Sequence, residues 1–423
     1  MDAPTTNNKK KKKVSSNSSH IPDDISFMIL YKLPVKSLKR FSCVRKSWSL
    51  LFENHDFFKM FRNNVISKSH PHYDDACQML TQNEEHKWNI YLLSGDKFEN
   101  KVKLDFPTSS FPRPTPEYSF RPFSVLGSAI NGILCIFHKN DTLLWNPATE
   151  EIKVIPPGFA EFKHDVYTFI NRCGFGYDHV THDYKIIQHV GYIGIKTKLN
   201  SFWEIYSLKS NSWRKIDFEM PTMSWLSNNV VYFDGVCHWW GLSNKLMSFN
   251  LCNEMCFITP LFLEDLPNDF DVVNLNVLNG CVAIITSRMD STSFQISILG
   301  EFGVKESWIK LFDVERMSCN IYPIGIGKKG NIFFQSKDDE LTCLDLTTGL
   351  VKDTGLKGNK FTCQVFLFYY TAAAFCLCLC ATVLNTFLHI HRHFVSGLFR
   401  FWNILKRQGE EVPSSSIQRP KWK

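Results

Sequence analysis

The sequence predicts an α+β multidomain protein in which a small three-helix module precedes a mostly antiparallel, β-propeller-like domain. Three observations carry this prediction. Apolar residues recur at helical spacing within residues 21–61, strand–turn–strand patterns repeat through residues 87–360, and an uncharged apolar stretch at 366–388 is a candidate transmembrane helix. The chain of 423 residues is long enough for such a module plus one large domain with a sizeable core.

Composition favours β-structure and places much of the positive charge near the chain ends. Aromatic residues make up 14%, including 36 Phe and 11 Trp, and such residues are enriched on β-sheet surfaces. The net charge of +7 is concentrated in Lys9–Lys13 and after position 391. Residues 1–20, a Lys-rich leader, are predicted to be disordered. The lysine run is interpreted as a solvated tail, with a nuclear-import or anionic-surface patch as the alternative. Because no signal peptide stands at the N-terminus, cytoplasm and/or nucleus is the expected location.

The 14 cysteines show neither a metal-ligand nor a disulfide pattern. There is no Cys-x-x-Cys pair, and Cys252 and Cys256 lie four residues apart without a second ligand pair nearby, so no zinc site is expected. The chain is far longer than a disulfide-stapled mini-domain. Reduced, mostly buried thiols are therefore predicted, and no cofactor is expected.

Residues 21–61 predict three short helices. Asp23 and Asp24 precede an apolar series spaced three to four residues apart, namely Ile25, Met28, Ile29 and Leu33. A capped amphipathic helix that ends before Pro34 is therefore predicted. The ranges 37–44 and 46–52 predict the second and third helices. So small a unit is marginal alone and gains stability from a partner.

Several short motifs in this module occur in the order and at the spacing of a known family. They are Ile21–Ile25, Ile29–Leu30, Leu33–Leu38 and Cys43–Trp48. These motifs resemble the F-box, although Ile21 stands where that family usually has Leu. The resemblance implies docking to the Skp-type adaptor of a cullin-RING ubiquitin ligase. The residues it implies, either for docking or for building the module, are Ile21, Pro22, Ile25, Ile29, Leu30, Leu33, Pro34, Leu38, Val44 and Trp48.

Residues 87–360 contain repeated hairpin patterns in which alternate residues are predicted to be buried. The central residues of four hairpins, Ile205, Met247, Ile296 and Thr342, are separated by 42, 49 and 46 residues. An extra strand pair widens the distance from Leu144 to Ile205 to 61 residues. A repeat of roughly 40–50 residues with about four strands is typical of a propeller. Five to seven blades would fit, and a β-sandwich is the structural alternative.

Four segments of this region resemble the F-box-associated interaction domain of plants, a kelch-like relative. They are Leu144–Thr149, Gly174–Asp178 with Asp183–Lys185, Asp234–Trp239 and Phe302–Trp308. The match extends over roughly residues 90–360 and follows the F-box-like motifs in the family's order. It implies that this domain binds the protein destined for ubiquitination.

Binding in such a domain is expected on loops rather than strands. The candidate loops are Pro107–Arg121, Ile193–Asn200, Thr222–Asn229 and Ser287–Ser293. The repeated Trp residues are interpreted as core residues. A metal cluster of His179 and His182 with Asp178 and Asp183 could be imagined, but their place in a predicted hairpin turn favours a solvated turn. No phosphate-binding glycine loop, HExxH, GxSxG or paired-carboxylate arrangement occurs, so a non-catalytic adaptor is predicted.

The C-terminal region combines an apolar stretch with a basic tail. A twenty-residue helix spans about 30 Å, enough for a bilayer core, so residues 366–388 are predicted as a transmembrane helix and 389–423 as a basic tail. The rival interpretation is a buried closing element, because Phe361–Val365 resembles the family's closing strand. Positive charge after the span favours a cytosolic C-terminus, which conflicts with a cytosolic F-box.

Together these features predict a substrate-recognition subunit of an SCF-type (Skp–cullin–F-box) ubiquitin ligase. The expected partners are the Skp-type adaptor, an unidentified target protein and a membrane, but no nucleic acid. One rival is a membrane-associated interaction scaffold that recruits no ligase. Another is a propeller-type enzyme, which would need an acid/base or cofactor cluster that the sequence does not show.

Overall fold

The computed structural model describes residues 22–33, scattered positions from 37 to 64, and residues 76–369 with gaps, the longest at 112–122, 221–229 and 262–270. The chain divides into two compact units, residues 1–64 and 65–423, and each is described by itself. The predicted leader 1–20 and basic tail 389–423 lie outside the described residues.

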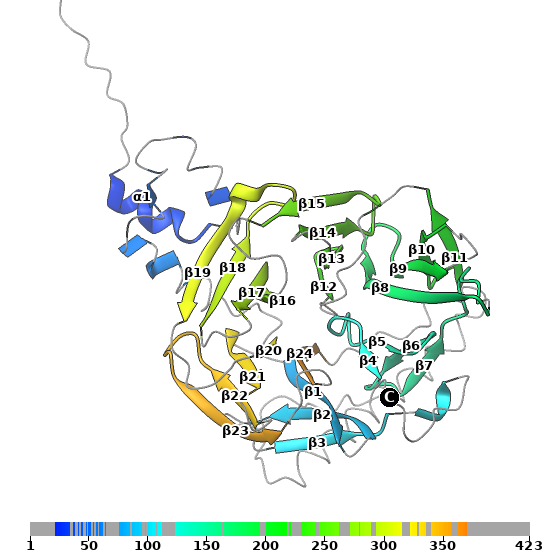
Figure 1. Cartoon of the computed structure of the whole chain (residues 1–423). Coiled ribbons are helices and arrows are strands. Elements are labelled where there is room, and N and C mark those ends of the chain that lie inside the picture. The colour runs from blue at the N-terminus through cyan, green and yellow to red at the C-terminus, as the bar shows by residue number, and fades with distance from the viewer. Residues whose placement is uncertain are drawn as a thin grey trace, which may run out of the picture. The chain divides into compact units, whose positions relative to one another are not determined.

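The second unit is a propeller of six four-stranded antiparallel sheets arranged in a ring (Figure 1). The first blade contains, from the inside outward, β24 (Gln364–Tyr369), β1 (Ala76–Glu84), β2 (Lys87–Ser94) and β3 (Asn100–Leu104). The second contains β4 (Ser124–Val125), β5 (Leu134–His138), β6 (Asp141–Asn146) and β7 (Glu151–Val154). The third contains β8 (Val166–Asp178), β9 (Asp183–Gly194), β10 (Phe202–Ser207) and β11 (Ser212–Ile216).

The other three blades follow in chain order. The fourth contains β12 (Val230–Phe233), β13 (Val236–Gly241), β14 (Lys245–Asn250) and β15 (Cys256–Pro260). The fifth contains β16 (Asp271–Leu278), β17 (Cys281–Arg288), β18 (Phe294–Leu299) and β19 (Trp308–Val314). The sixth contains β20 (Tyr322–Ile326), β21 (Ile332–Gln335), β22 (Glu340–Leu344) and β23 (Val351–Lys357).

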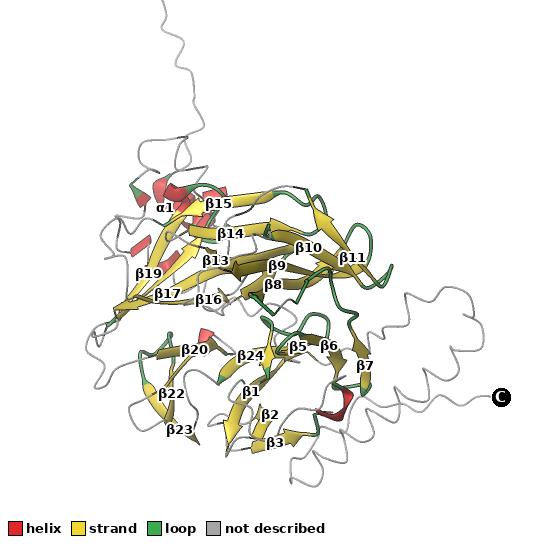
Figure 2. Cartoon of the chain, turned by 45° about the vertical axis from the view of Figure 1, so that its right-hand side comes forward, coloured by secondary structure: helices red, strands yellow, loops and turns green. Residues whose placement is uncertain are grey.

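The propeller prediction is confirmed, the blade number is six, and the β-sandwich alternative is excluded. Inner strands of successive blades touch: β8 with β12, β12 with β16, β16 with β20, and β20 with β24. Strands dominate this unit, and its described helices are short turns such as η2 (Thr108–Ser110) and η3 (Lys305–Ser307) (Figure 2).

The third blade explains the wide spacing before Ile205. Its strands β8 and β9 have 13 and 12 residues, whereas strands usually have about 5–6. The extra strand pair expected from the sequence is this long inner hairpin, and it belongs to the same blade as Ile205.

Strands from both ends of the domain close the ring. β24 pairs with β1, with Val365 opposite Leu80 and Phe366 opposite Met79, and all four side chains are buried. The closing strand suggested near Phe361–Val365 is thus present, at Gln364–Tyr369.

The propeller consequently extends beyond the expected range 87–360 at both ends. The predicted range did not include β1 because this strand lacks a clear apolar alternation: it buries the polar side chains of Gln78, Thr81 and Gln82. A pattern based on buried apolar residues does not detect such a strand.

The start of the predicted transmembrane span 366–388 is wrong, because Phe366–Tyr369 pairs with β1 as sheet. Hydropathy alone cannot separate a buried strand from the apolar residues that follow it. Residues 370–388 lie outside the described residues. Within the described part of the chain, no helix has both the length and the apolar character needed to cross a membrane.

Aromatic and small residues fill the spaces between blades. The prediction of core tryptophans is confirmed for six that are at most 9% exposed, namely Trp88, Trp145, Trp203, Trp239, Trp240 and Trp308. A Cβ atom on Gly174 of the third blade would lie 2.5 Å from the sulfur of Cys237 in the fourth, so this close approach requires glycine. The described cysteines are mostly buried, as predicted.

Candidate protein-interaction sites

In the described part of the N-terminal unit, the first predicted helix is present as α1 (Asp23–Leu30), but its start differs from the expectation. Asp23 and Asp24 are the first two helical residues and do not precede the helix. Pro22 is the N-cap residue and makes no side-chain capping bond, so the capping prediction is wrong. The helix ends at Leu30, ahead of Pro34.

The structure sorts the predicted F-box residues into interior and surface groups. Leu30 and Leu38 are buried, at 4% and 0% exposed, and therefore build the unit. Ile25, Ile29 and Val44 are 49%, 52% and 69% exposed, so they contribute little to its interior.

The remaining predicted residues are less clearly divided. Leu33 and Trp48 are half-buried, and Pro22 is exposed. Ile21 and Pro34 lie outside the described residues. Most of the second and third predicted helices does too, so their existence stays a prediction.

Sequence reasoning missed part of the interior of this unit. Phe57 and Phe61 are at most 1% exposed, and the rings of Phe27 and Phe57 meet edge to face at 5.6 Å. The four-residue spacing of Phe57 and Phe61 is a helical signal that could have identified them.

Helix α1 presents an exposed apolar side. Ile25, Met28 and Ile29 are 49–56% exposed, and positions three and four apart lie next to one another on a helix. Fully burying an aliphatic side chain is worth roughly 1.5–3 kcal/mol, so covering these residues with a partner is favourable.

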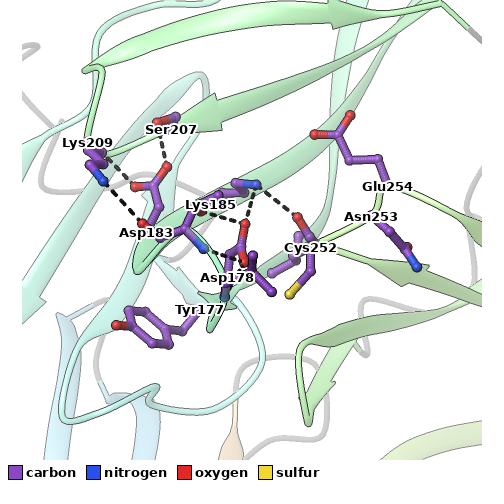
Figure 3. Close-up of polar contacts among 12 residues, drawn as sticks. Tyr177, Asp178, Asp183, Lys185, Ser207, Lys209, Cys252, Asn253 and Glu254 are labelled. Atoms are coloured by element: carbon purple, nitrogen blue, oxygen red, sulfur yellow. Dashed lines mark hydrogen bonds and ion pairs between the residues drawn. The ribbon is translucent and has the colours of Figure 1, made fainter.

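In the propeller, Asp178 and Lys185 form a buried ion pair at the β8–β9 turn (Figure 3). Lys185 Nζ lies 2.7 Å from Asp178 Oδ2 and also donates to the carbonyl oxygen of Leu251 at 2.9 Å. Asp178 Oδ1 accepts from the backbone N–H groups of Val180 and Thr181, at 2.8 and 3.1 Å. Asp178 thus closes the turn, and Lys185 links the third blade to the fourth.

Burial alone would raise the pKa of Asp178, but hydrogen bonds, above all from Lys185, outweigh it and hold the pKa well below its ordinary value. Asp178 therefore remains a carboxylate in its buried position and completes an interblade tie rather than a reactive site.

The solvated-turn prediction is right for the histidines and wrong for the acids. His179 and His182 are exposed, whereas Asp178 and Asp183 are buried. Asp183 accepts hydrogen bonds from the Ser207 hydroxyl and the Lys209 backbone N–H. Among the described residues, no group of His, Cys, Asp or Glu is arranged to hold a metal ion.

All four candidate loops leave the blades at the same end of the ring. Loops 107–121 and 222–229 connect an outer strand to the next inner strand, and loops 193–200 and 287–293 connect a second strand to a third. In an antiparallel four-stranded blade, both kinds of connection start at one end, here named the connector end. The inner hairpin turns, such as 178–183, lie at the opposite end. Much of each loop is outside the described residues, but the flanking strands fix its end.

Comparison with known proteins agrees with this architecture. A family model of the F-box associated beta propeller domain matches residues 78–361. The putative F-box protein At3g16210 of Arabidopsis thaliana is 26% identical over 238 residues, which cover 56% of this chain and 58% of that protein. The putative F-box protein At5g15660 of the same plant is 26% identical over 304 residues, or 69% of this chain and 64% of that protein.

A third relative is covered more fully. F-box protein CPR1 of Arabidopsis thaliana is 27% identical over 328 residues, covering 70% of this chain and 73% of that protein. For the first two relatives the chain spans less than two thirds of their length. The family match itself covers more than half of this chain. The chain therefore belongs to the plant F-box proteins that carry an F-box associated beta-propeller domain.

Proposed function

We propose that this protein is the substrate-recognition subunit of an SCF-type ubiquitin ligase. The observation that carries the proposal is the exposed apolar side of α1, formed by Ile25, Met28 and Ile29 on a unit separate from the propeller. An apolar helix side of this kind fits a groove on a partner. The partner is a Skp-type adaptor, and the propeller holds the target.

In this role the chain itself performs no bond chemistry. The N-terminal unit connects to the ligase, the connector-end loops of the propeller bind the target, and proximity to the ubiquitin-transfer subunits supplies the rate enhancement. Family membership supports this division of roles, since the relatives are F-box proteins.

The test is pull-down of a plant Skp-type adaptor by the full chain carrying Ile25→Asp and Ile29→Asp. These substitutions place two charges on the exposed side of α1 without removing a buried group, so loss of adaptor binding is expected. Leu350→Asp is the matched control, because Leu350 is a comparably exposed apolar residue of the propeller, at 58%. It should leave binding unchanged.

Adaptor capture by the double variant at the level of the control would contradict the proposal and favour the scaffold that recruits no ligase. Limited proteolysis of residues 22–64 distinguishes loss of the docking contact from loss of the folded unit. Leu38→Ala would test folding instead, because Leu38 is fully buried.

A further inference from the structure

The third blade contains a buried arginine whose charge is only partly matched. Arg172 of β8 is 6% exposed. Its Nε donates to the hydroxyl of Thr142 at 2.9 Å, and the guanidinium carbon lies 4.7 Å from the centre of the Phe137 ring. Phe137 and Thr142 are cross-strand neighbours on β5 and β6, so the second blade forms a cradle for this guanidinium.

The two terminal nitrogens of Arg172, Nη1 and Nη2, are not held in the way that Nε is. Among the described residues neither Nη atom donates a hydrogen bond, and neither belongs to the fully enclosed polar atoms that lack a partner, so neither is completely sealed from solvent. No described carboxylate forms an ion pair with Arg172, and Asp141 influences it only through space. Glu204 lies in the same cross-strand row, because Gln188 of β9 pairs with both Arg172 and Glu204. The Glu204 carboxylate accepts hydrogen bonds from the Gln188 side chain at 2.7 Å and from the Phe159 backbone N–H at 2.9 Å, and not from Arg172.

This arrangement is costly unless an anion completes it. Burial lowers the pKa of Arg172 to about 10, so the side chain still carries its charge at neutral pH. A desolvated charge is unfavourable without a paired partner, and a guanidinium offers parallel donors that match a carboxylate or phosphoryl group.

The cradle lies where a target would reach it. Phe137 is the penultimate residue of β5 and Thr142 the second of β6, so both flank the β5–β6 turn at the connector end. All four candidate loops leave from that end. Phe137 is only half-buried, so the ring that contacts the guanidinium is itself partly exposed to solvent.

We propose that Arg172, held by Phe137 and Thr142, recognises an oxyanion group on a side chain of the target protein. The group is a carboxylate or a phosphoryl group, bound by the two free Nη atoms. This inference rests on the proposed function for its biological meaning, because it names the chemistry by which the propeller selects a target. Binding itself is independent of the adaptor.

The experiment measures binding of the full chain to three short Gly/Ser peptides that differ only at the central residue, which is Ser, Glu or phosphoserine. The wild-type chain is expected to bind an anionic peptide and not the Ser peptide, and the better of the two anionic peptides identifies the source of the oxyanion. Arg172→Met should weaken this binding at least about tenfold, since one partner of a hydrogen-bonded charge pair is removed. Arg214→Met is the control, because Arg214 is exposed on the same blade and pairs with Glu254.

Stability separates recognition from a structural role. Without peptide, Arg172→Met should melt no lower than the wild type, because replacing a buried charge by an apolar group is often neutral or stabilising. If that variant does not fold, Arg172→Lys decides, since it retains the charge but loses the planar pair of donors.

The proposal is overturned if the wild type binds neither anionic peptide at millimolar concentration, binds all three equally, or loses nothing on substitution of Arg172. A failed adaptor pull-down with intact peptide binding would count against the ligase role alone.

Discussion

Replacing Lys185 by Met should strongly destabilise the propeller. The substitution keeps the length of the side chain but removes both the ion pair with Asp178 and the hydrogen bond to Leu251. Asp178 is fully buried, so its charge would lose its cationic partner in a place without water. Breaking a buried pair in this way costs about 3–5 kcal/mol.

The expected loss lies at the lower end of that range. Asp178 keeps its backbone hydrogen bonds from Val180 and Thr181, which stabilise the remaining carboxylate. We therefore expect the free energy of unfolding to fall by about 3 kcal/mol. Asp178→Asn combined with Lys185→Met should cost less than the sum of the single changes, because the two side chains interact directly.

The pH dependence has a definite sign. The folded-state pKa of Asp178 is depressed, so its contribution is present above the unfolded pKa of about 4 and is lost as pH falls below it. Lys185→Met should reduce this acid sensitivity, because the main group that lowers the pKa is gone.

Urea denaturation followed by tryptophan fluorescence measures these changes. Lys209→Met is the matched control: Lys209 lies in a neighbouring turn and its Nζ makes an exposed hydrogen bond of 3.3 Å to Thr181. It should change stability by about 0.5 kcal/mol or less. If Lys185→Met lowers the free energy of unfolding no more than this control does, the stabilising role of the Asp178–Lys185 ion pair is refuted.

Three further predictions concern closure, interblade contact and acid stability. Val365 of the closing strand is 3% exposed, so Val365→Asp places a carboxylate in the interior and should cost about 3 kcal/mol. An unchanged thermal midpoint would contradict the closure argument. Gly174→Ala should cost about 1–3 kcal/mol through its clash with Cys237, and Cys237→Gly in the same chain should recover part of that loss, so strict additivity would argue against the contact. Burial lowers the pKa of His238 from 6.5 to about 3, so the unfolded state binds more protons between these values and stability should fall by about 1.4 kcal/mol per pH unit as the pH drops below 6.5. His238→Gln should flatten this slope, and an identical slope would exclude His238 as its source.

The propeller could be predicted because most blades repeat local signals. The strands around Met247 and Ile296 recur as short apolar segments bounded by polar turns, and this strand–turn–strand pattern can be recognised without knowledge of the neighbouring blades. The predicted burial of alternate residues is wrong for both strands, because four consecutive residues of each are buried between neighbouring blades. The exceptions are β1, which buries Gln78 and Gln82, and the β24 region, whose strand merges with a longer apolar run. Both strands are defined by their pairing with each other, which joins the two ends of the domain and has no local sequence signal.

The candidate sites were less predictable, because they depend on distant contacts. The F-box resemblance supplied Ile29 and Leu38 together, but only burial distinguishes the surface residue from the interior one. Arg172 gives no sequence signal at all, since its meaning comes from Phe137 and Thr142, about thirty residues earlier in the chain.

Pairing of β24 with β1 has a consequence for biosynthesis. During translation the strand that covers Met79 and Leu80 is the last of the domain to leave the ribosome, after every other blade has emerged. Until then β1 has an unpaired edge and its apolar residues Met79 and Leu80 lack their partners on β24, a state prone to aggregation and bound by chaperones. The propeller can therefore close only after β24 has been synthesised. A message truncated before codon 364 would yield a ring that is not closed by β24.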